Sequence, residues 1–378
     1  MFDECMPVAG AIAYQLLSLG RPGAASAPEL EVALAKGNDA LAAVALRALA
    51  AYRSPAAVPS AVRLLGDDDV TCRWAALDVL SAMGPSARAA TPALVNALER
   101  GPWDVRARVA TLLGELGDPR AIDPLHRAIG HSPASAQATS ARALAQFRGA
   151  ARAAAPELEQ LAAEHWSWPV RRAAADAAWA LSGKQVAPRV PSCRTHEKNA
   201  AGRWSIEWNS RELELLPIEV EIAQTFGTGP CAGLRSTVLI AGGDTCIVGE
   251  SRGEWGGSLL AVRGSERRVL RAAWDTNPLR AVRLGSVYLV VEGLDHLGSN
   301  TGIVTRVSRG PKGAWEAEPL VELAGMPIAF ATTEAGALLL LTGDASRESG
   351  CPEEPGVRAP HRDSLVRIDS DGSVRSLP

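Results

Sequence analysis

One pentapeptide has the spacing of a catalytic serine. "GESRG" at 249–253 matches Gly-x-Ser-x-Gly, the nucleophile elbow in which the serine, here Ser251, attacks a carbonyl carbon. That chemistry needs a strand before the serine and a helix after it. The preceding "TCIV" fits a strand, but the following "EWGGSLLAV" contains paired glycines that favour a hairpin turn. We therefore interpret the motif as a turn.

Three further motifs hint at metal or nucleotide chemistry. "DSDG" at 369–372 begins like a calcium loop but lacks the later acidic ligand, so a hairpin turn is the better interpretation. "CRTH" at 193–196 offers two zinc ligands without the second pair that structural zinc requires. "GTGPCAG" at 227–233 lacks the strand–helix context of a dinucleotide site. The sequence predicts no metal and no cofactor.

Polar side chains also gather in "LDHLGSNTG", which contains Asp295, His296 and Asn300. His361 lies in a second polar segment, 343–363. Loops on a rigid strand scaffold are where binding sites concentrate, so these four residues are binding candidates. If these four side chains converge at one mouth of the β domain, they would favour a hydrolase or lactonase. The structural alternative is a solvated loop held by Asx turns.

The six cysteines are too sparse for a disulfide scaffold. Cys351, in the 343–363 segment, is a candidate to form a disulfide with Cys231 or Cys246 if the protein is exported. Asp3 and Glu4 stand where a signal peptide needs positive charge, which predicts a cytoplasmic protein. A start upstream of Met1 would instead permit an extracytoplasmic one. No apolar run reaches the roughly 18 residues of a membrane span.

Charge argues against nucleic acid as a partner. The chain has 39 basic and 42 acidic residues, and residues 1–185 hold 18 of each, so that half is neutral. A sequence-independent nucleic-acid binder would show a basic excess, although arginines gathered on one face would still permit a DNA-binding protein. Arginine greatly outnumbers lysine and alanine is abundant, which fits the coding bias of a GC-rich bacterial genome.

The N-terminal half is periodic. Prolines precede apolar helical segments at successive spacings of 31, 33, 32 and 32 residues, at Pro28, Pro59, Pro92, Pro124 and Pro156. A fixed period of this size is typical of a solenoid, and proline at a first helical turn sacrifices no hydrogen bond. Each unit continues into an Ala- and Leu-rich second helix, such as "VRARVATLLGELG", which ends at a glycine. These hairpins are too small to bury their own faces and must stack.

The phrases "GDPRAIDPL", "DVRARVATLLGELG" and "PVRRAAADAAWAL" resemble the short HEAT-like repeats also found in phycobilin lyases. The resemblance covers roughly residues 7–184. It implies protein binding, which is what most such arrays do, and it also leaves a bilin-lyase-like activity open. The resemblance further implies an Asp–Arg ladder between units, which Asp104 and Arg106 fit and Gln137 interrupts.

Several side chains of this half are binding candidates with a structural alternative. Tryptophans in turns between the paired helices could form a binding ridge or fill gaps between units, and the arginines could contact a ligand or pair along the array. These candidates are Trp103, Arg106, Arg108, Trp166, Trp168, Arg171 and Arg172.

Beyond the repeats, short Val-, Leu- and Ile-rich segments alternate with Gly and Asp. Three stretches share a plan of four strands, at a spacing of about 45 residues that is typical of propeller blades. "TGIVTRVS", "SLVRIDSDGSV" and "EAGALLLL" resemble β-propeller repeats. Three blades are fewer than the four that usually close a ring, and 203–226 could supply part of another.

We therefore expect an α+β multidomain protein. An α-solenoid of HEAT-like hairpins spans 1–184, a linker spans 185–202, and an all-β, propeller-like domain spans 203–378. With no coherent catalytic set, the sequence favours a non-enzymatic scaffold that binds a protein partner and neither nucleic acid nor membrane. An enzyme remains the alternative, and a HEAT-type DNA-binding protein is a third.

Overall fold

The computed structural model describes residues 49–50, 54, 57–67, 70–188, 197–198, 204–208, 211–218, 231, 237–251, 256–273, 276–296, 299–311, 313–323, 325–333, 335–342, 364–369 and 371–376. The chain divides into two compact units. The first is Met1–His165 with Pro169–Arg189, and the second is Trp166–Trp168 with Val190–Pro378. The division after Arg189 falls inside the segment 185–202 that the sequence predicts as a linker.

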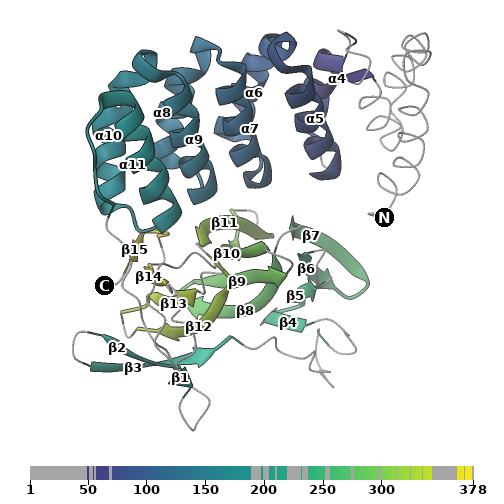
Figure 1. The fold of residues 1–378 in the computed structure, drawn as a ribbon. Coiled ribbons are helices and arrows are strands. Elements are labelled where there is room, and N and C mark those ends of the chain that lie inside the picture. The colour runs from purple at the N-terminus through teal and green to yellow at the C-terminus, as the bar shows by residue number, and fades with distance from the viewer. Residues whose placement is uncertain are drawn as a thin grey trace. The chain divides into compact units, whose positions relative to one another are not determined.

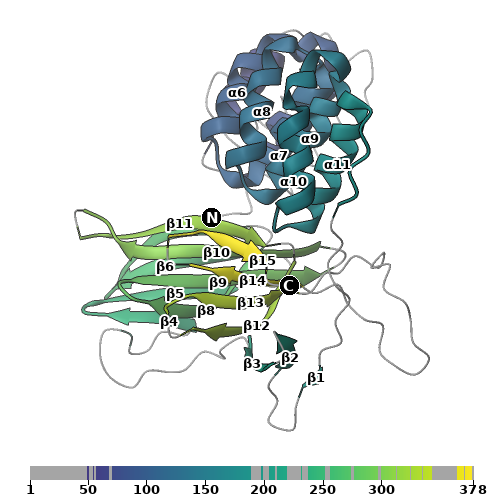
Figure 2. The ribbon, with the colours of Figure 1, turned by 90° about the vertical axis from the view of Figure 1, so that its left-hand side faces the viewer.

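Helices of two kinds alternate along the first unit. The shorter first helices are α4 (Ala57–Leu64), α6 (Thr91–Arg100), α8 (Ile122–His131) and α10 (Ala155–Glu164). The longer second helices are α5 (Val70–Met83), α7 (Trp103–Leu116), α9 (Ala134–Gln146) and α11 (Trp168–Ser182). The short 3-10 segments η2 (Gly84–Ala90), η3 (Pro119–Ala121) and η4 (Arg148–Ala154) connect one pair to the next. First helices form one row and second helices the other (Figures 1 and 2).

The predicted repeat register is confirmed within the described residues. Each periodic proline lies in the first turn of a first helix, at Pro59, Pro92, Pro124 and Pro156, where a missing N–H removes no helical hydrogen bond. Pro28 lies outside the described residues. The glycines that follow three second helices have the left-handed backbone that ends a helix, with φ of 54° at Gly84, 60° at Gly117 and 72° at Gly183.

Small residues allow the repeats to approach closely. A Cβ atom at Gly114 of α7 would lie only 2.9 Å from the Cβ of Ala143 on α9. Leucines from both rows fill the space between the two rows of helices, and Leu94, Leu113 and Leu144 have no exposed surface. One continuous apolar core therefore runs through the described repeats, as stacked hairpins require. None of the described helices is both long enough and apolar enough to cross a membrane.

Three antiparallel sheets make up the second unit (Figure 1). The first contains β4 (Thr237–Gly242), β5 (Thr245–Ser251), β6 (Gly257–Arg263) and β7 (Glu266–Ala273). The second contains β8 (Asn277–Leu284), β9 (Val287–His296), β10 (Ser299–Arg309) and β11 (Trp315–Leu323). The third contains β12 (Pro327–Thr332), β13 (Leu338–Thr342), β14 (Ser364–Ile368) and β15 (Val374–Ser376). The predicted groups of four strands are thus confirmed.

The strands β1 (Glu197–Lys198), β2 (Trp204–Trp208) and β3 (Arg211–Pro217) differ from expectation. They extend the third sheet instead of beginning a further blade, because β3 pairs with β12 through Leu216 and Phe330. Among the described residues the three sheets do not close into a ring.

Successive sheets pack through the same kind of contact, in which a proline of one sheet lies against two glycines of the sheet before it. Pro278, at the start of the second sheet, lies against Gly249 and Gly257 of the first, where a Cβ would come within 2.9 and 2.7 Å of its ring. Pro327, at the start of the third sheet, lies against Gly293 and Gly302 of the second, where a Cβ would come within 2.7 and 2.9 Å of its ring. Each proline thus occupies the space left by two glycines.

Apolar side chains fill the remainder of both sheet interfaces. Ile247 and Leu259 pack with Val290 between the first and second sheets, and Val291 packs with Phe330 between the second and third. Side chains alternate along each strand, so neighbouring residues of β9 serve opposite interfaces.

Candidate protein-interaction surface

The second helices present equivalent positions to the next repeat along the array. On α5, Trp74, Asp78 and Ser81 reach α7: Asp78 pairs with Arg108, and the Arg108 guanidinium lies 5.7 Å from the centre of the Trp74 ring. Ser81 Oγ lies 3.2 Å from a carboxylate oxygen of Glu115. These contacts connect neighbouring helices at their exposed edges, which leaves the outer side of the row for other molecules.

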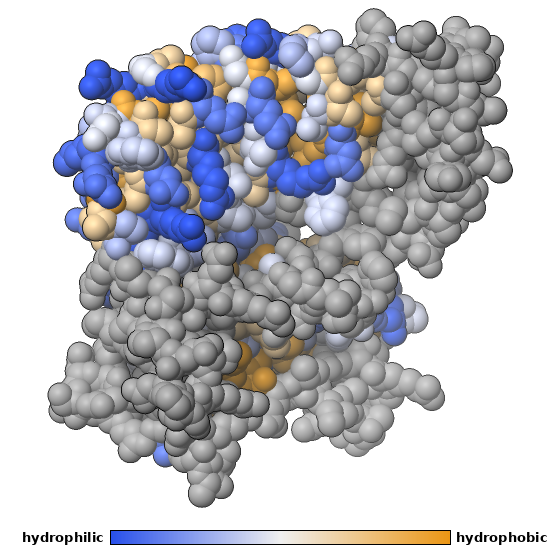
Figure 3. All heavy atoms as spheres, in the orientation of Figure 1, coloured by the Kyte–Doolittle hydropathy of each residue, from blue (hydrophilic) through white to orange (hydrophobic). Residues whose placement is uncertain are grey.

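The exposed side of this row is charged and balanced. Three arginines and three carboxylates are exposed on it, together with three uncharged polar residues: Arg108, Arg142, Arg172, Asp78, Glu115, Asp176, Ser81, Thr111 and Gln146. Figure 3 views this side and shows hydrophilic residues spread over it with apolar ones between. The continuous row of helices therefore presents charges of both signs.

Two arginines at the predicted ladder positions make local hydrogen bonds, while the side chain of Asp104 lies outside the described residues. Arg106 Nε donates to the carbonyl oxygen of Gly101 at 2.8 Å, and Arg73 Nη1 donates to that of Asp67 at 2.8 Å. Each arginine therefore holds the turn that precedes its own helix. Burial lowers the pKa of Arg106, and Arg171 and Gln137 are buried at the same repeat position. Of the candidate arginines, Arg108 and Arg172 are exposed.

The tryptophan candidates do not share one compact unit. Trp103 begins α7 and is half-buried in the first unit, whereas the half-buried Trp166 and Trp168 are grouped with the second. The sequence interpretation missed Trp179 on α11, whose side chain is 63% exposed. Its position one helical turn from the polar Asp176 was the available signal, since a buried stripe on α11 would exclude both.

Two strand connections leave their sheets at the same end. Asp295 pairs with Asn300, and His296 with Ser299, where β9 meets β10. Pro327 of β12 contacts Gly293 of β9 and also pairs with Thr342, the last residue of β13. The end of β13 therefore lies near the end of β9. The backbone of Asp295, His296 and Asn300 is therefore gathered at that end, while His361 lies outside the described residues.

A buried carboxylate lies close to this end. Glu292 of β9 is 1% exposed, and its Oε2 atom lies 3.0 Å from Arg271 Nη1 on β7 and 3.2 Å from Thr276 Oγ1. Thr305 of β10 donates to the other carboxylate oxygen. Guanidinium and hydroxyl donors thus surround the charge, and the cluster connects the first two sheets instead of forming an open site.

The serine motif and two of the cysteines lie in strand connections and strands of the second unit. Ser251 ends β5, and β6 pairs with β5 antiparallel from Gly257, so a hairpin and no helix follows the serine. Cys231 and Cys246 form a disulfide with their Cα atoms 5.9 Å apart. The expected pairing of Cys351 with either cysteine is therefore wrong, because each already has a partner. Cys351, Cys193 and His196 lie outside the described residues.

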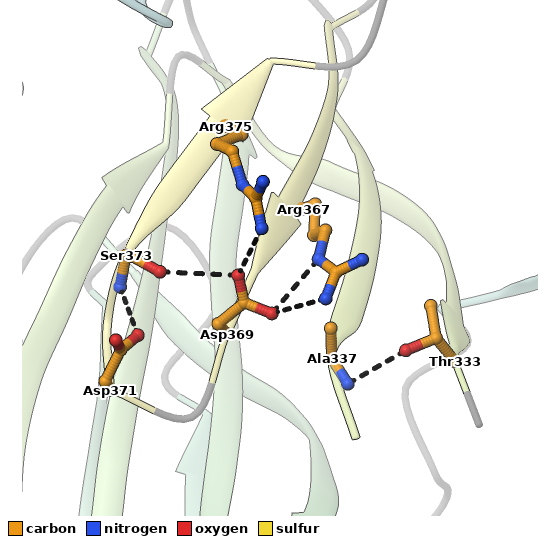
Figure 4. Close-up of polar contacts among 7 residues, drawn as sticks. All are labelled: Thr333, Ala337, Arg367, Asp369, Asp371, Ser373 and Arg375. Atoms are coloured by element: carbon orange, nitrogen blue, oxygen red, sulfur yellow. Dashed lines mark hydrogen bonds and ion pairs between the residues drawn. The ribbon is translucent and has the colours of Figure 1, made fainter. Parts of the chain in front are cut away.

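"DSDG" forms the predicted hairpin turn (Figure 4). Asp369 accepts hydrogen bonds from Arg367 at 2.7 Å and from Arg375 at 3.2 Å, and Asp371 accepts from the Ser373 backbone N–H at 2.9 Å. These donors lower the pKa of both carboxyl groups, with the Arg367 bond the largest cause at Asp369. Both carboxylates serve the turn, and no group of three potential metal ligands occurs among the described residues.

Comparison with known proteins agrees with the repeat geometry. Residues 27–99 and 91–179 match the family model of HEAT repeats. The N-terminal region is an array of HEAT repeats. This confirms the resemblance drawn from the sequence, and the exposed row of second helices is one side of that HEAT array. No curated protein matches the chain.

The solved structures that are similar to part of this chain include a lyase complex. It is the complex of CpcE and CpcF of phycocyanin lyase from Nostoc sp. PCC7120, with 27% sequence identity and a TM-score of 0.35. The match covers 42% of this chain and 65% of that one, so the chain spans less than two thirds of its length.

Proposed function

We propose that this protein is a non-enzymatic scaffold whose HEAT array binds a protein partner through the exposed row of second helices. The observation that carries the proposal is the row itself: α5, α7, α9 and α11 present side by side a surface of balanced charge. Extended surfaces of this kind are how stacked-repeat proteins bind other proteins. The partner is a protein, and neither nucleic acid nor a membrane is required.

Side-chain availability supports the same reading. The side chains of Arg142, Arg172 and Asp176 are exposed and make no hydrogen bond or ion pair within the described residues. Arginine is enriched at protein interfaces because its planar group bonds carboxylates and stacks on aromatic rings. Charges that serve no internal contact are suited to pairing across an interface.

For the second unit we propose a propeller-like arrangement whose strand connections carry a second ligand. The support is repetition: each sheet contains four consecutive strands paired in chain order, to which the third sheet adds β1–β3, and the proline-on-glycine contact recurs from one sheet to the next. The connections that include Asp295, His296 and Asn300 would then lie at one mouth, where ligand sites of such folds occur.

Site-specific photo-crosslinking in cells tests the scaffold proposal. A photoreactive amino acid replaces Thr111 of α7 or Arg142 of α9, both exposed on the proposed surface. The matched control replaces Gln160, which is exposed on α10 in the other row. We expect the same protein adduct from positions 111 and 142 and none from 160. Equal adducts at all three positions, or none from the folded protein, would overturn the proposal.

A further inference from the structure

One side of α11, the last described helix of the HEAT array, corresponds to the side through which earlier second helices pack on the next repeat. Aligning Arg171 with Arg106 places Arg172, Asp176 and Trp179 at the positions of Ala107, Thr111 and Gly114. Gly114 packs against α9 of the following repeat, so its position faces the next unit, whereas Thr111 lies at the exposed edge of that side. Among the described residues no helix follows α11, and all three side chains on this side are exposed.

The same side of α5 shows what chemistry these positions hold. There, the Asp78 carboxylate and the Trp74 ring, one helical turn apart, hold the guanidinium of Arg108 from the adjacent helix. On α11, Asp176 has the position of Asp78, and Trp179 places an indole one turn after the carboxylate, where α5 has its indole one turn before. Neither the Asp176 nor the Trp179 side chain makes a hydrogen bond, ion pair or ring contact within the described part of the chain.

We propose that the Asp176–Trp179 side of α11 binds a helix of a partner protein that presents an arginine. The guanidinium lies against the Trp179 ring and bonds the Asp176 carboxylate, as Arg108 does on α5. Arginine is favoured over lysine because its planar group stacks on an indole while it forms two parallel bonds to a carboxylate. Arg172, one turn before Asp176, selects a partner helix with an acidic residue at that level.

This inference rests on the proposed function, because it names a second contact of the same scaffold at the end of its array. An indole exposed to 63% with a carboxylate beside it has the composition of an interface centre, where Trp and Arg dominate the binding energy. A purely protective cap would instead carry polar residues alone.

The test uses the full chain labelled with 5-fluorotryptophan, in which Trp179→Phe identifies the Trp179 resonance. The probes are alanine-rich helical peptides that are identical except for one central Arg or Gln. We expect the Arg peptide to shift the Trp179 resonance and the Gln peptide to leave it unchanged. Asp176→Asn should weaken binding of the Arg peptide about two- to fivefold, as loss of an exposed ion pair does.

Asp123→Asn is the matched control, since it removes an exposed carboxylate from α8 in the other row. Equal shifts from both peptides, or equal weakening by the two Asn variants, would overturn the proposal. A Trp179 shift that depends on the concentration of the protein alone would also overturn it, by placing a second copy on this side. Crosslinking at Thr111 and Arg142 is independent of these outcomes, so failure here is distinguishable from failure of the scaffold proposal.

Discussion

At the residue scale, turns between repeats show how single side chains decide local stability. Gly84, Gly117 and Gly183 end their helices with positive φ, and the equivalent position after α9 is Arg148, with φ of 49°. A side chain in this left-handed region crowds its own carbonyl group, which costs about 1 kcal/mol. One repeat therefore carries local strain that the others avoid.

Arg148→Gly should stabilise the HEAT array. Relief of the left-handed strain outweighs the larger conformational freedom that glycine has in the unfolded chain, for a net gain of about 0.5 kcal/mol. Urea unfolding followed by circular dichroism measures the change. Gly117→Ala is the reverse control and should lower stability. A destabilised Arg148→Gly variant would show that the arginine side chain contributes more than its backbone costs.

Asp118 should make the HEAT array sensitive to acid. Its carboxylate accepts from the Arg120 side chain and backbone, and the Arg120 side-chain bond is the main cause of a pKa far below the ordinary range. A lowered pKa stabilises the folded state above about pH 4, the unfolded value, and this stabilisation is lost as pH falls toward the folded value.

Asp118→Asn should therefore lower the free energy of unfolding at pH 7 by about 1 kcal/mol, because it removes the ion pair with the exposed Arg120 while asparagine can still cap the turn. The difference between wild type and variant should narrow as pH falls from 5 to 3. Urea titrations at a series of pH values provide the measurement. A difference that stays constant over this range would mean that the ionised carboxylate is not the stabilising group.

At the element scale, each helix and sheet is stable only through its neighbours. Second helices place small residues at Gly114 and Ala143, and sheets place prolines over paired glycines, so close approach is the common device. A charged contact also occurs, at Glu292, which is buried between the first two sheets with Arg271 beside it. Substitutions that remove either apolar volume or a charge can test both kinds of contact.

Leu112→Ala should destabilise the HEAT array by about 2–5 kcal/mol, because the change leaves a cavity in a packed core. Leu112 of α7 is 3% exposed. The adjacent Thr111 is exposed on the same helix, so Thr111→Ala should change stability by less than about 0.5 kcal/mol. Chemical denaturation of both variants gives the comparison, and similar losses would contradict the assigned helix face.

Arg271→Met should destabilise the second unit by about 3–5 kcal/mol, because it removes the guanidinium that balances a buried carboxylate. Glu292→Gln added to that variant should restore part of the loss, since the buried charge is then gone. Thermal unfolding of the single and double variants measures this coupling. A double variant no more stable than Arg271→Met would show that the cluster acts through packing alone.

At the scale of the whole molecule, two units have separate cores of different kinds. The HEAT array holds one core of leucine and alanine, and the sheets hold several smaller ones between their faces. The Cys231–Cys246 disulfide belongs to the second unit, where it closes a 15-residue separation. Covalent stabilisation is thus confined to one unit among the described residues.

Reduction should therefore lower the stability of the second unit alone, by about 3 kcal/mol for a loop of this length. Calorimetry with and without reductant should show two transitions, of which the helical one stays in place. The variant Cys246→Ser should reproduce the shift without reductant. Movement of the helical transition in that variant would mean that the units do not unfold independently.

Signals that repeat along the chain were readable from the sequence. The spacing of Pro59, Pro92, Pro124 and Pro156 predicted the HEAT array, and Gly-containing turns between apolar segments predicted three groups of four strands. These signals are local, because a proline at a first turn or a glycine with positive φ acts on its own backbone. The interpretation of "DSDG" as a turn succeeded for the same reason.

Contacts between residues distant in sequence were decided only by the tertiary structure. Cys246 pairs with Cys231 and not Cys351, Glu292 is buried against Arg271, and Trp179 is exposed while Gly114 at the same repeat position is buried. Helical periodicity assigns a residue to a face, but what lies opposite that face depends on the element stacked there. Trp179 and Gly114 occupy equivalent positions, and they differ because a helix follows α7 and none follows α11 within the described residues.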